Sequence, residues 1–458
     1  MKIRAFFGQS EFASSVLMLA SGTVIAQVIP ILVSPILTRI YTPDEFATFG
    51  LFSALVSIFG VVATGKYEFA IMLPEKERDA LIIVVLSTII SIAVGIVLLV
   101  AVLFFHDRII AFLGNPDFSL WLYLLPLGVV FAGFYQILNF WNNRKKAYPV
   151  IARSKIVRAV ASNLINILLG FFKIGIKSAA AFGLIIGLIA GQLIEVLMLL
   201  KVRSLKNVKE RLSFSISEIG LLARRYIAFP KYDVPSELMI TASVQMPVLL
   251  LNRFFEQYVV GLYFHAHKVL SLPMSMIGSS IGQVLYKQLS DTRQNRSDFT
   301  DLVYKTYSRL ILIGAIPFAF VGVFGPELFG IVFGQAWAES GIFARLIAPW
   351  LLFNFIGSPL TIIFSVLERQ REMFFWIGVM FLSRVASLLF GFLYFKDVYY
   401  SIFLFSASGT VFYFVMNFYL VNRLAGVNIK DFLRATFIKP ILILGSVLIL
   451  KYIVSLLP

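Results

Sequence analysis

The chain has 458 residues, of which 59% are hydrophobic and only 14% are charged, and its formal net charge is +16. Soluble domains carry about 25% charged residues, so this composition excludes a soluble globular protein and predicts a polytopic membrane protein. Because most of the positive charge lies in short loops between apolar runs, it indicates membrane topology and not a nucleic-acid partner. The sequence has no cysteine, which excludes disulfides, thiolate catalysis and cysteine metal sites.

The apolar runs are continuous and about 20 residues long, which is typical of spanning helices and not of barrel strands. They predict thirteen spans, at about 14–37, 46–64, 81–105, 120–141, 157–172, 179–200, 233–252, 259–286, 304–325, 342–367, 374–395, 401–421 and 438–457. The first run is too long for a cleaved signal peptide and is expected to be retained. The fifth is short, and the last contains Lys451, which can snorkel to the membrane surface.

Lysine and arginine residues gather in every second loop. On the side of the N-terminus, which carries Lys2 and Arg4, they lie in the segments 144–158, 201–225, 287–309, 369–371 and 423–439, whereas the opposite loops hold few. Positively charged loops stay in the cytoplasm, so the N-terminus is predicted to be cytoplasmic. Thirteen spans would then place the C-terminus outside; if the last run is only interfacial, the C-terminus is inside.

The longest cytoplasmic connection, residues 201–232, separates the sixth and seventh spans. Within it, Ser215 and Glu218 have the spacing of a capping box, which predicts the start of a helix. The following residues place apolar side chains on one face, with Arg224 and Arg225 beyond them. This pattern is typical of a basic amphipathic helix on the inner membrane surface. A site for a partner protein is the alternative.

An internal repeat divides the chain on either side of this connection. The matching pairs are Arg39–Phe52 with Arg253–Ala266, Gly114 with Gly334, Pro126 with Pro349, Arg144 with Arg369, Lys146 with Arg371, and Arg158 with Arg384. We therefore predict an N-terminal six-helix lobe (1–200), a linker (201–232), a C-terminal six-helix lobe (233–421) and an extra span (422–458). Transporters built from such repeats bind substrate at the repeat interface near the bilayer midplane.

Ionisable residues inside spans are costly and usually face a cavity or a charged partner. The eighth span is the richest in them, with His265, His267 and Lys268, and Pro273 can bend the helix beyond them. His265 and Lys268 are three positions apart and share a helix face. They predict a cationic cavity wall that binds substrate. The alternative is that these side chains lie close to the outer surface of the bilayer, where water hydrates them.

Arginines provide further candidates for substrate binding. Arg39 and Arg253 end the first and seventh spans at equivalent positions, Arg345 opens the tenth span, and Arg384 lies inside the eleventh. Guanidinium groups bind pyrophosphate and other anionic head groups well. Near a membrane surface, ordinary snorkelling is the alternative.

Carboxylates within or beside the spans are few. A buried carboxyl group can exchange protons near neutral pH, which makes Glu195 and Glu237 candidates for ion coupling. A structural pair with a neighbouring Arg or Lys is the alternative for each. Lys66 and Glu68, which follow the second span, are equally open to a structural ion pair or a site.

Motifs of enzymes are missing from the chain: it has no P-loop, no G-x-S-x-G, no H-E-x-x-H and no D-x-D. Its three histidines are too few for most metal sites. We therefore expect a protein that is not an enzyme and that has no catalytic residue, no metal and no cofactor.

Four stretches of the chain resemble one known family. They are LTRIYTPDEFATFGLF (Leu37–Phe52), ATGKYEFAIMLP (Ala63–Pro74), SLPMSMIGSSIGQVLYKQLS (Ser271–Ser290) and FGQAWAESGIFARLIAPW (Phe333–Trp350). In this order and with this topology, the chain is similar to the polysaccharide biosynthesis, or oligosaccharide flippase, proteins of the multidrug/oligosaccharidyl-lipid/polysaccharide exporter superfamily. The stretches lie in both halves, so the resemblance covers nearly the whole chain.

This resemblance implies an inner-membrane flippase for undecaprenyl-diphosphate-linked oligosaccharides that feed O-antigen, capsule or exopolysaccharide. It implies alternation between inward and outward openings around a cationic cavity, coupled to H⁺ or Na⁺, with glycan polymerase and assembly proteins as partners. The expected fold is all-α and MATE-like, with about 12–14 transmembrane helices in two pseudo-repeated lobes of six. The family's usual twelve or fourteen spans differ from the thirteen counted here.

Two other functions are compatible with the residues. A multidrug or cation antiporter of the same superfamily is the first alternative. It would favour an acidic cavity, whereas this chain has 40 Lys and Arg residues and only 24 Asp and Glu residues. A membrane-bound glycan polymerase or ligase is the second. Such enzymes typically need a substantial outside loop, and the predicted outside loops are at most about 17 residues long.

Overall fold

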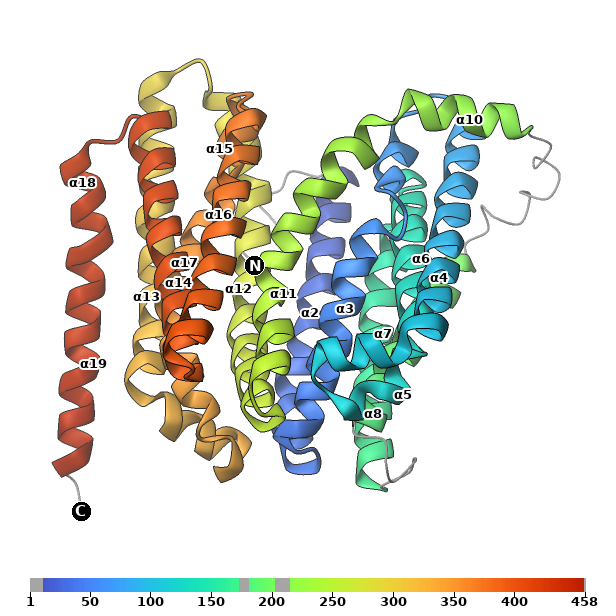
Figure 1. The fold of residues 1–458 in the computed structure, drawn as a ribbon. Helices are drawn as coiled ribbons and strands as arrows, with labels where there is room; N and C mark the ends of the chain where they lie inside the picture. Colours follow the sequence, from blue (N-terminus) through green and yellow to red (C-terminus); the bar gives the residue numbers. More distant parts are fainter. Residues whose placement is uncertain (1–10, 173–180, 202–214, 457–458) are drawn as a thin grey trace. The chain divides into compact units, whose positions relative to one another are not determined.

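The computed structural model describes residues 11–172, 181–201 and 215–456, except for the side chains of residues 11–20, 275, 279, 280 and 283. Every regular element in these residues is a helix, which confirms the all-α prediction (Figure 1). Close packing divides the chain into unit 1, Met1–Gln257, and unit 2, Tyr258–Pro458.

Unit 1 consists of long helices joined by short connections. The long helices are α2 (Glu11–Ile40), α3 (Pro43–Val62), α4 (Glu77–Leu113), α6 (Leu125–Arg144), α7 (Tyr148–Phe171), α8 (Phe182–Leu200) and α11 (Val234–Phe254). The shorter elements are η1 (Tyr67–Met72), η2 (Pro116–Phe118), α5 (Ser119–Leu122), α10 (Ile216–Arg225) and η4 (Phe229–Asp233). Helix α2 packs on α7, α7 on α8, α4 on α6, and α11 on α3.

Unit 2 is built in the same way. Its long helices are α12 (Gln257–Thr292), α13 (Arg296–Phe333), α14 (Ser340–Leu360), α16 (Gln370–Phe390), α17 (Val398–Phe418) and α19 (Lys439–Leu456). Its shorter elements are η5 (Gln335–Trp337), α15 (Ile362–Val366), η6 (Gly391–Phe395), η7 (Tyr419–Leu424), α18 (Ile429–Leu433) and η8 (Arg434–Ile438). Helix α14 packs between α13 and α17, and α16 packs on α17.

Eleven helices in the described residues are long and apolar enough to cross a membrane, or twelve if the bent pair Pro116–Leu122 and Leu125–Arg144 is one span. The count is lower than the predicted thirteen. The eighth predicted span forms the 36-residue helix α12, but it is not among the eleven. Its first half carries His265, His267 and Lys268, which reduce its apolar character.

The fifth span is longer than predicted. Helix α7 starts at Tyr148, and Pro149 lies in its first turn, where a proline needs no amide donor. Arg153, Lys155 and Arg158, which sequence reasoning assigned to a loop, therefore lie on a helix. Two of these three side chains contribute to the charged cluster described below.

Helix α19 is attached to unit 2 through α13. Val447 packs with Ala319 and Val323 of α13 in a small apolar cluster. The Nζ atom of Lys451 donates to Glu327 Oε1 at 2.8 Å and to the carbonyl oxygen of Val323 at 2.8 Å. Lys451, which can snorkel to the membrane surface, thus has an ion-pair partner within unit 2.

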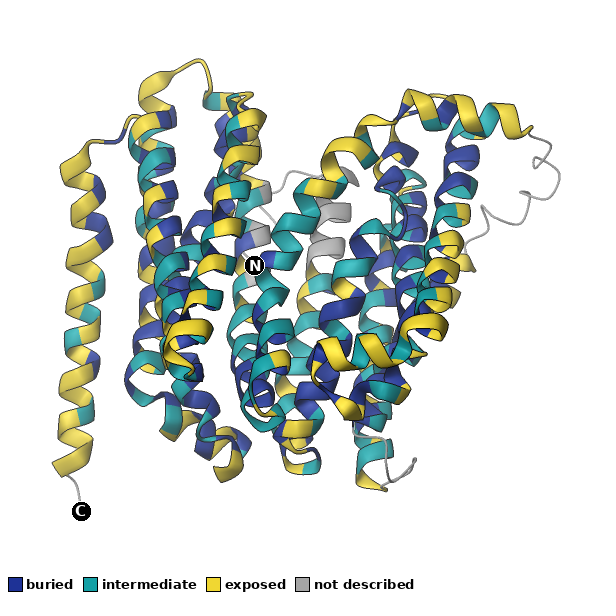
Figure 2. Ribbon diagram, in the orientation of Figure 1, coloured by how far each residue is buried: buried dark blue, intermediate teal, exposed yellow. Residues whose placement is uncertain are grey.

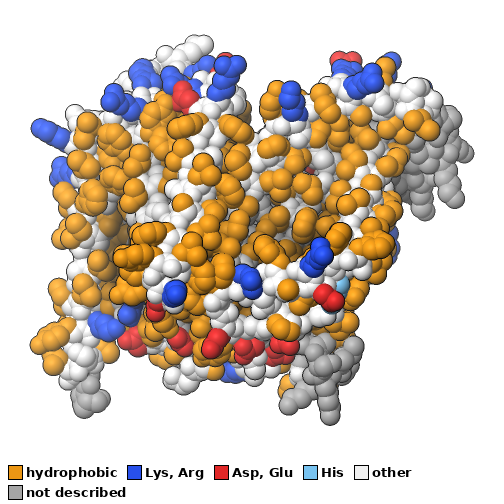
Figure 3. All heavy atoms as spheres, in the orientation of Figure 1, with side chains coloured by type: hydrophobic (Ala, Val, Ile, Leu, Met, Phe, Trp, Pro, Cys, Tyr) orange, Lys and Arg blue, Asp and Glu red, His pale blue; other side chains and the backbone are white. Residues whose placement is uncertain are grey.

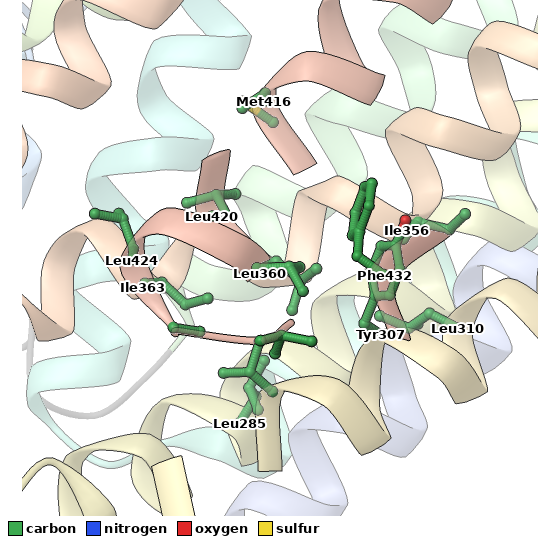
Figure 4. Close-up of a cluster of buried hydrophobic side chains, with 14 of the residues drawn as sticks. Leu285, Tyr307, Leu310, Ile356, Leu360, Ile363, Met416, Leu420, Leu424 and Phe432 are labelled. Carbon is green, nitrogen blue, oxygen red and sulfur yellow. The ribbon is translucent and has the colours of Figure 1, made fainter. Parts of the chain in front are cut away.

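The core of unit 2 lies where the N-terminal part of α13 and the C-terminal parts of α14 and α17 meet α18 (Figure 4). Tyr307 stacks on Phe432 with 5.2 Å between ring centres, and its hydroxyl lies 2.7 Å from Thr436 Oγ1. The aliphatic side chain of Leu360 lies beside Phe432, and Leu420 belongs to the same buried cluster. A buried tyrosine whose hydroxyl has a partner adds apolar area without an unsatisfied polar group.

Large apolar side chains are exposed along the helices (Figure 2). Phe104, Phe112 and Ile331 are each more than 70% exposed, at 78%, 73% and 74%. Figure 3 shows hydrophobic atoms on the sides of the helices and charged side chains mainly near their ends. An aqueous surface would not tolerate so much apolar area, so lipid must cover it.

The predicted amphipathic helix is present as α10. Ser215 Oγ accepts from the Glu218 amide at 3.3 Å, and Glu218 Oε2 accepts from the Ser215 amide at 2.8 Å, so the predicted capping box is confirmed. Leu222 packs into the core of unit 1, and the Tyr67 hydroxyl donates to the Ala223 carbonyl at 3.0 Å. The preceding residues 202–214 lie outside the described residues.

Local structures recur in the order that the repeat predicts. Helix α4 ends at Gly114 (φ +72°), and α13 ends at Gly334 (φ +101°). Gly114 is followed by the 3-10 helix η2, the short helix α5 and the 20-residue helix α6, and Gly334 is followed by the 3-10 helix η5 and the 21-residue helix α14. Unit 1 also contains a seventh long helix, α11, which packs on α3.

Candidate functional site

Arg39 and Arg253 lie in the last turns of α2 and α11, respectively. Both side chains are exposed, and Arg39 Nη1 donates to the Pro35 carbonyl of its own helix at 2.7 Å. A cation at a helix C-terminus is favoured by the helix dipole. These arginines therefore stabilise helix ends and leave charged groups at the surface of unit 1.

A charged cluster that the sequence only partly indicates lies inside unit 1. Glu195 on α8 is fully buried, and its Oε2 accepts from Arg158 Nη1 of α7 at 2.8 Å. Arg158 also lies over the ring of Tyr135, 5.8 Å from its centre. One turn earlier on α7, Lys155 Nζ donates to Thr23 Oγ1 of α2 at 3.1 Å. The alternative of a structural pair thus describes Glu195 in this conformation.

Glu237, the second candidate for ion coupling, lies in the first turn of α11. Its side chain is half-buried. A carboxylate in the first turn interacts favourably with the positive end of the helix dipole. This position stabilises the start of α11, whereas Glu195 lies on another helix, α8.

The cationic side chains of α12 are buried to different extents. His265 is fully buried, with its ring 4.5 Å from Phe333, 4.6 Å from Trp337 and 5.7 Å from Phe329 between centres. Lys268 is half-buried, and its Nζ lies 5.8 Å from the ring centre of Phe264. The shared helix face is observed, but in this conformation His265 packs in the core of unit 2.

Arg345 and Arg384 have opposite environments. Arg345 on α14 is exposed, and its Nη2 donates to the Val323 carbonyl at 3.0 Å. Arg384 on α16 is only 1% exposed. Its guanidinium carbon lies 3.8 Å from the ring centre of Trp350 and 4.1 Å from that of Phe405. Of the predicted arginines, it is the one enclosed by aromatic rings.

A structured loop joins α3 to α4. Lys66 adopts a left-handed conformation (φ +61°), and buried Glu68 accepts a hydrogen bond from the Thr64 hydroxyl. Arg144 donates to the carbonyls of Ile71 and Pro74 at 3.0 and 2.6 Å. Burial raises the pKa of Glu68, and the Thr64 hydrogen bond and Lys66 offset this only in part. Glu68 therefore pairs with Thr64 and not with Lys66.

The described residues hold no group of three or more His, Asp or Glu side chains arranged to bind a metal ion. Their charged groups instead act as donors and acceptors between helices. The exposed arginines and Lys268 can contact an anionic ligand, and the Arg158–Glu195 pair can change partners when a helix moves or when its carboxylate binds a proton.

The sequence profile of the polysaccharide biosynthesis protein family matches residues 36–341. The chain belongs to this family. A curated relative, the succinoglycan biosynthesis transport protein ExoT of Rhizobium meliloti (strain 1021), is 23% identical over 314 residues, which cover 67% of this chain and 59% of that protein. The chain thus spans about three-fifths of the length of this relative.

Solved structures extend the likeness to nearly the whole chain. A structure of the lipid II flippase MurJ has a TM-score of 0.70 at 14% identity and covers 94% of this chain and 92% of its own. An inward-facing multidrug resistance transporter of the MATE family and MOP superfamily has a TM-score of 0.65 at 14% identity, covering 88% and 94%. The predicted MATE-like fold is confirmed. The curated relative and the MATE structure are both named as transport proteins.

Sequence reasoning missed three features of this family member's interior. The contact of Lys155 with Thr23 joins helices α2 and α7, which are far apart in sequence. Burial of Glu68 follows from the packing of the loop under α10. The stacking of Arg384 depends on rings from two other helices. A signal for the first was available, because Lys155 and Arg158 are one turn apart on a helix that starts with Tyr148-Pro149.

Proposed function

We propose that the chain is a flippase that translocates an undecaprenyl-diphosphate-linked oligosaccharide, a unit of O-antigen, capsule or exopolysaccharide, across the bacterial inner membrane. The main observation behind this proposal is the family match over residues 36–341. A relative named as a succinoglycan biosynthesis transport protein supports it. The likeness in fold to a lipid II flippase is consistent with a lipid-linked substrate.

The diphosphate of this substrate is anionic and would bind guanidinium and ammonium groups. Arg39, Arg253 and Arg345 are exposed and Lys268 is half-buried, so these four side chains are the first candidates to contact it. His265 and Arg384 are buried within unit 2. Their contact with substrate would require the surrounding helices to move apart.

Alternating access is the transport mechanism that we propose, coupled to H⁺ or Na⁺ through Glu195 and Glu237. Protonation of Glu195 would remove the negative charge that holds Arg158 at 2.8 Å and would free that arginine. The proposed orientation has the N-terminus in the cytoplasm. It is supported by the many Lys and Arg side chains near one end of the helices and the Asp and Glu side chains near the other (Figure 3).

Replacement of a contacting cation tests this assignment. In a bacterial strain that lacks its own flippase, we expect Lys268→Ala and Arg253→Ala to reduce surface glycan made with this protein, without a change in protein level. Lys287→Ala, an exposed lysine of the same helix α12, is the matched control and should restore glycan fully. Full glycan with both Lys268→Ala and Arg253→Ala would contradict the proposed contacts.

A multidrug or cation antiporter is the alternative, favoured by the likeness in fold to the MATE transporter. A cationic drug requires acidic side chains, whereas the exposed candidates here are basic. Efflux of ethidium from cells that express this protein, and not from cells without it, would support the antiporter.

A further inference from the structure

Arg384 is a buried cation enclosed by aromatic rings in unit 2. Trp350 of α14 and Phe405 of α17 contact its guanidinium group, with ring centres 3.8 and 4.1 Å from the guanidinium carbon. On α12, His267 stacks on Trp350 at 5.7 Å, and Tyr263 stacks on His267 at 6.1 Å. Four helices thus surround a charged group that is 1% exposed.

One edge of this guanidinium group lacks acceptors. Its Nε and Nη2 atoms are both buried, and within the described part of the chain neither makes a hydrogen bond. These two nitrogens lie on the same edge, so their N–H bonds point in nearly the same direction, as in bidentate binding of an anion. Trp350 Nε1 and the Tyr263 hydroxyl are also buried without a partner among the described residues.

Contact with aromatic rings compensates only part of the energy needed to bury this charge. A desolvated cation–π contact stabilises a cation only modestly. Removal of an ion from water costs more free energy than such a contact returns, and an unpaired buried charge is strongly destabilising. Aromatic rings offer no lone pair, so among the described residues the Nε and Nη2 atoms still have no hydrogen-bond acceptor. A buried, negatively charged acceptor would compensate the charge of Arg384 and would also accept hydrogen bonds from its N–H groups.

The internal sequence repeat pairs Arg384 on α16 with Arg158 on α7 of unit 1. The counterion of Arg158 is Glu195 on the following helix, α8, at 2.8 Å. In unit 2 the following long helix is α17, and its residues Val398–Phe418 include no Asp or Glu. The carboxylate of unit 1 therefore has no equivalent on α17.

We propose that unit 2 binds a small monovalent anion of the halide class, such as chloride, at the Nε–Nη2 edge of Arg384. The anion takes the place that the Glu195 carboxylate has beside Arg158, and Trp350 Nε1 is a further donor in the same cluster. Halide binding to this site can be measured without the lipid-linked substrate and without translocation, so it is tested separately from the proposed flippase function.

Thermal unfolding of the purified full-length protein in detergent tests the proposal. At constant ionic strength, we expect the melting temperature to rise and level off as sodium chloride replaces sodium gluconate, whose anion is a large hydroxylated carboxylate and not a halide. Arg384→Gln should abolish this dependence. Arg345→Gln, which removes an exposed arginine of α14, should keep it. Equal melting temperatures of the wild type in chloride and gluconate would overturn the proposal.

A second variant and a direct measurement protect the test from misfolding of Arg384→Gln. Phe405→Glu places a carboxylate beside Arg384 and should give a folded protein whose melting temperature no longer depends on chloride. Crystals of the wild type grown in bromide should show an anomalous peak at the Nε–Nη2 edge. A water molecule there and no bromide peak would refute the anion site, while normal glycan export would leave the proposed function intact.

Discussion

Single buried charges in this protein are stabilised in three different ways. Glu68 accepts a hydrogen bond from the Thr64 hydroxyl, Glu195 forms an ion pair with Arg158, and Arg384 lies against two aromatic rings. Burial removes water from each charge, so the stability of the fold depends on how well the replacement partner compensates. Substitutions at these positions measure that compensation directly.

Glu68 should make the stability of the protein depend on pH. Burial raises its pKa in the folded state above the ordinary value of 4.5, so the folded protein holds this proton more tightly than the unfolded chain. The contribution to stability is therefore full below pH 4.5 and is lost as the pH rises through the raised pKa. Each unit of the pKa shift corresponds to about 1.4 kcal/mol.

Glu68→Gln removes the titrating group and keeps an acceptor for Thr64. We expect its melting temperature to exceed that of the wild type at pH 7–8, and the difference to disappear near pH 4.5. Glu75→Gln, in the same loop but exposed, is the control and should not alter the melting curve against pH. A difference between Glu68→Gln and wild type that is constant with pH would speak against a buried, titrating carboxyl group.

The Arg158–Glu195 pair should show strong coupling. Arg158→Met leaves the Glu195 carboxylate buried without its partner and should destabilise unit 1 by about 3 kcal/mol, the lower end of the usual range because Arg158 is partly exposed. Glu195→Gln in the same chain should restore much of the loss. Thermal unfolding of both single variants and the double variant completes a double-mutant cycle. Additive effects on the free energy of unfolding would show that Arg158 and Glu195 are not energetically coupled.

The ends of the helices provide the constraints at the scale of elements. Gly114 ends α4 with its amide bound to the Ile110 carbonyl at 2.9 Å, and Gly334 ends α13 with its amide bound to the Gly330 carbonyl at 3.0 Å. Both have positive φ, which glycine adopts without steric penalty. At Gly114 the backbone of α11 also approaches closely, so one residue joins the end of α4 to the end of α11.

Gly114→Ala should be destabilising for two reasons. The left-handed conformation costs a residue with a Cβ atom about 1–2 kcal/mol. The new Cβ would also lie 2.7 Å from the Asn252 carbonyl oxygen and 3.0 Å from Arg253 Cα, which backbone movement must relieve. Gly378→Ala, in α16 with no atom within 4 Å of the added Cβ, should be neutral or stabilising. Equal melting temperatures for the two variants would contradict this packing.

At the scale of the whole molecule, charge distribution sets the expected orientation. The basic loops include Arg144–Lys146 and the exposed arginines of α10, whereas Asp107 and Asp117 lie at the other ends of helices in unit 1. Positively charged segments remain in the cytoplasm during insertion. The orientation is therefore a prediction of electrostatics and not of packing.

The absence of cysteine from the sequence makes this orientation easy to test. Ser217→Cys on α10 and Asp117→Cys on η2 introduce single exposed thiols. A membrane-impermeant maleimide should label Asp117→Cys in intact spheroplasts, and should label Ser217→Cys only after the membrane is permeabilised. The reverse pattern would show that the N-terminus is outside.

Much of the candidate site could be anticipated from single residues, but not their environments. The sequence singled out Glu195, His265 and Arg384 because charges are rare inside apolar runs. It could not tell that aromatic side chains surround His265, because Phe329, Phe333 and Trp337 come from more than 60 positions away. It also could not assign Arg158 to Glu195, because partners on different helices depend on the rotation of each helix.

The sequence by itself determined that the chain is all-helical and crosses a membrane, because twenty-residue apolar runs can satisfy their backbone hydrogen bonds in lipid only as helices. It also determined the capping box at Ser215–Glu218, which is a local property. Tertiary structure alone decided which charges are buried and what contacts them. Burial and partner choice arise from side chains on separate helices, and no local pattern encodes where those helices meet.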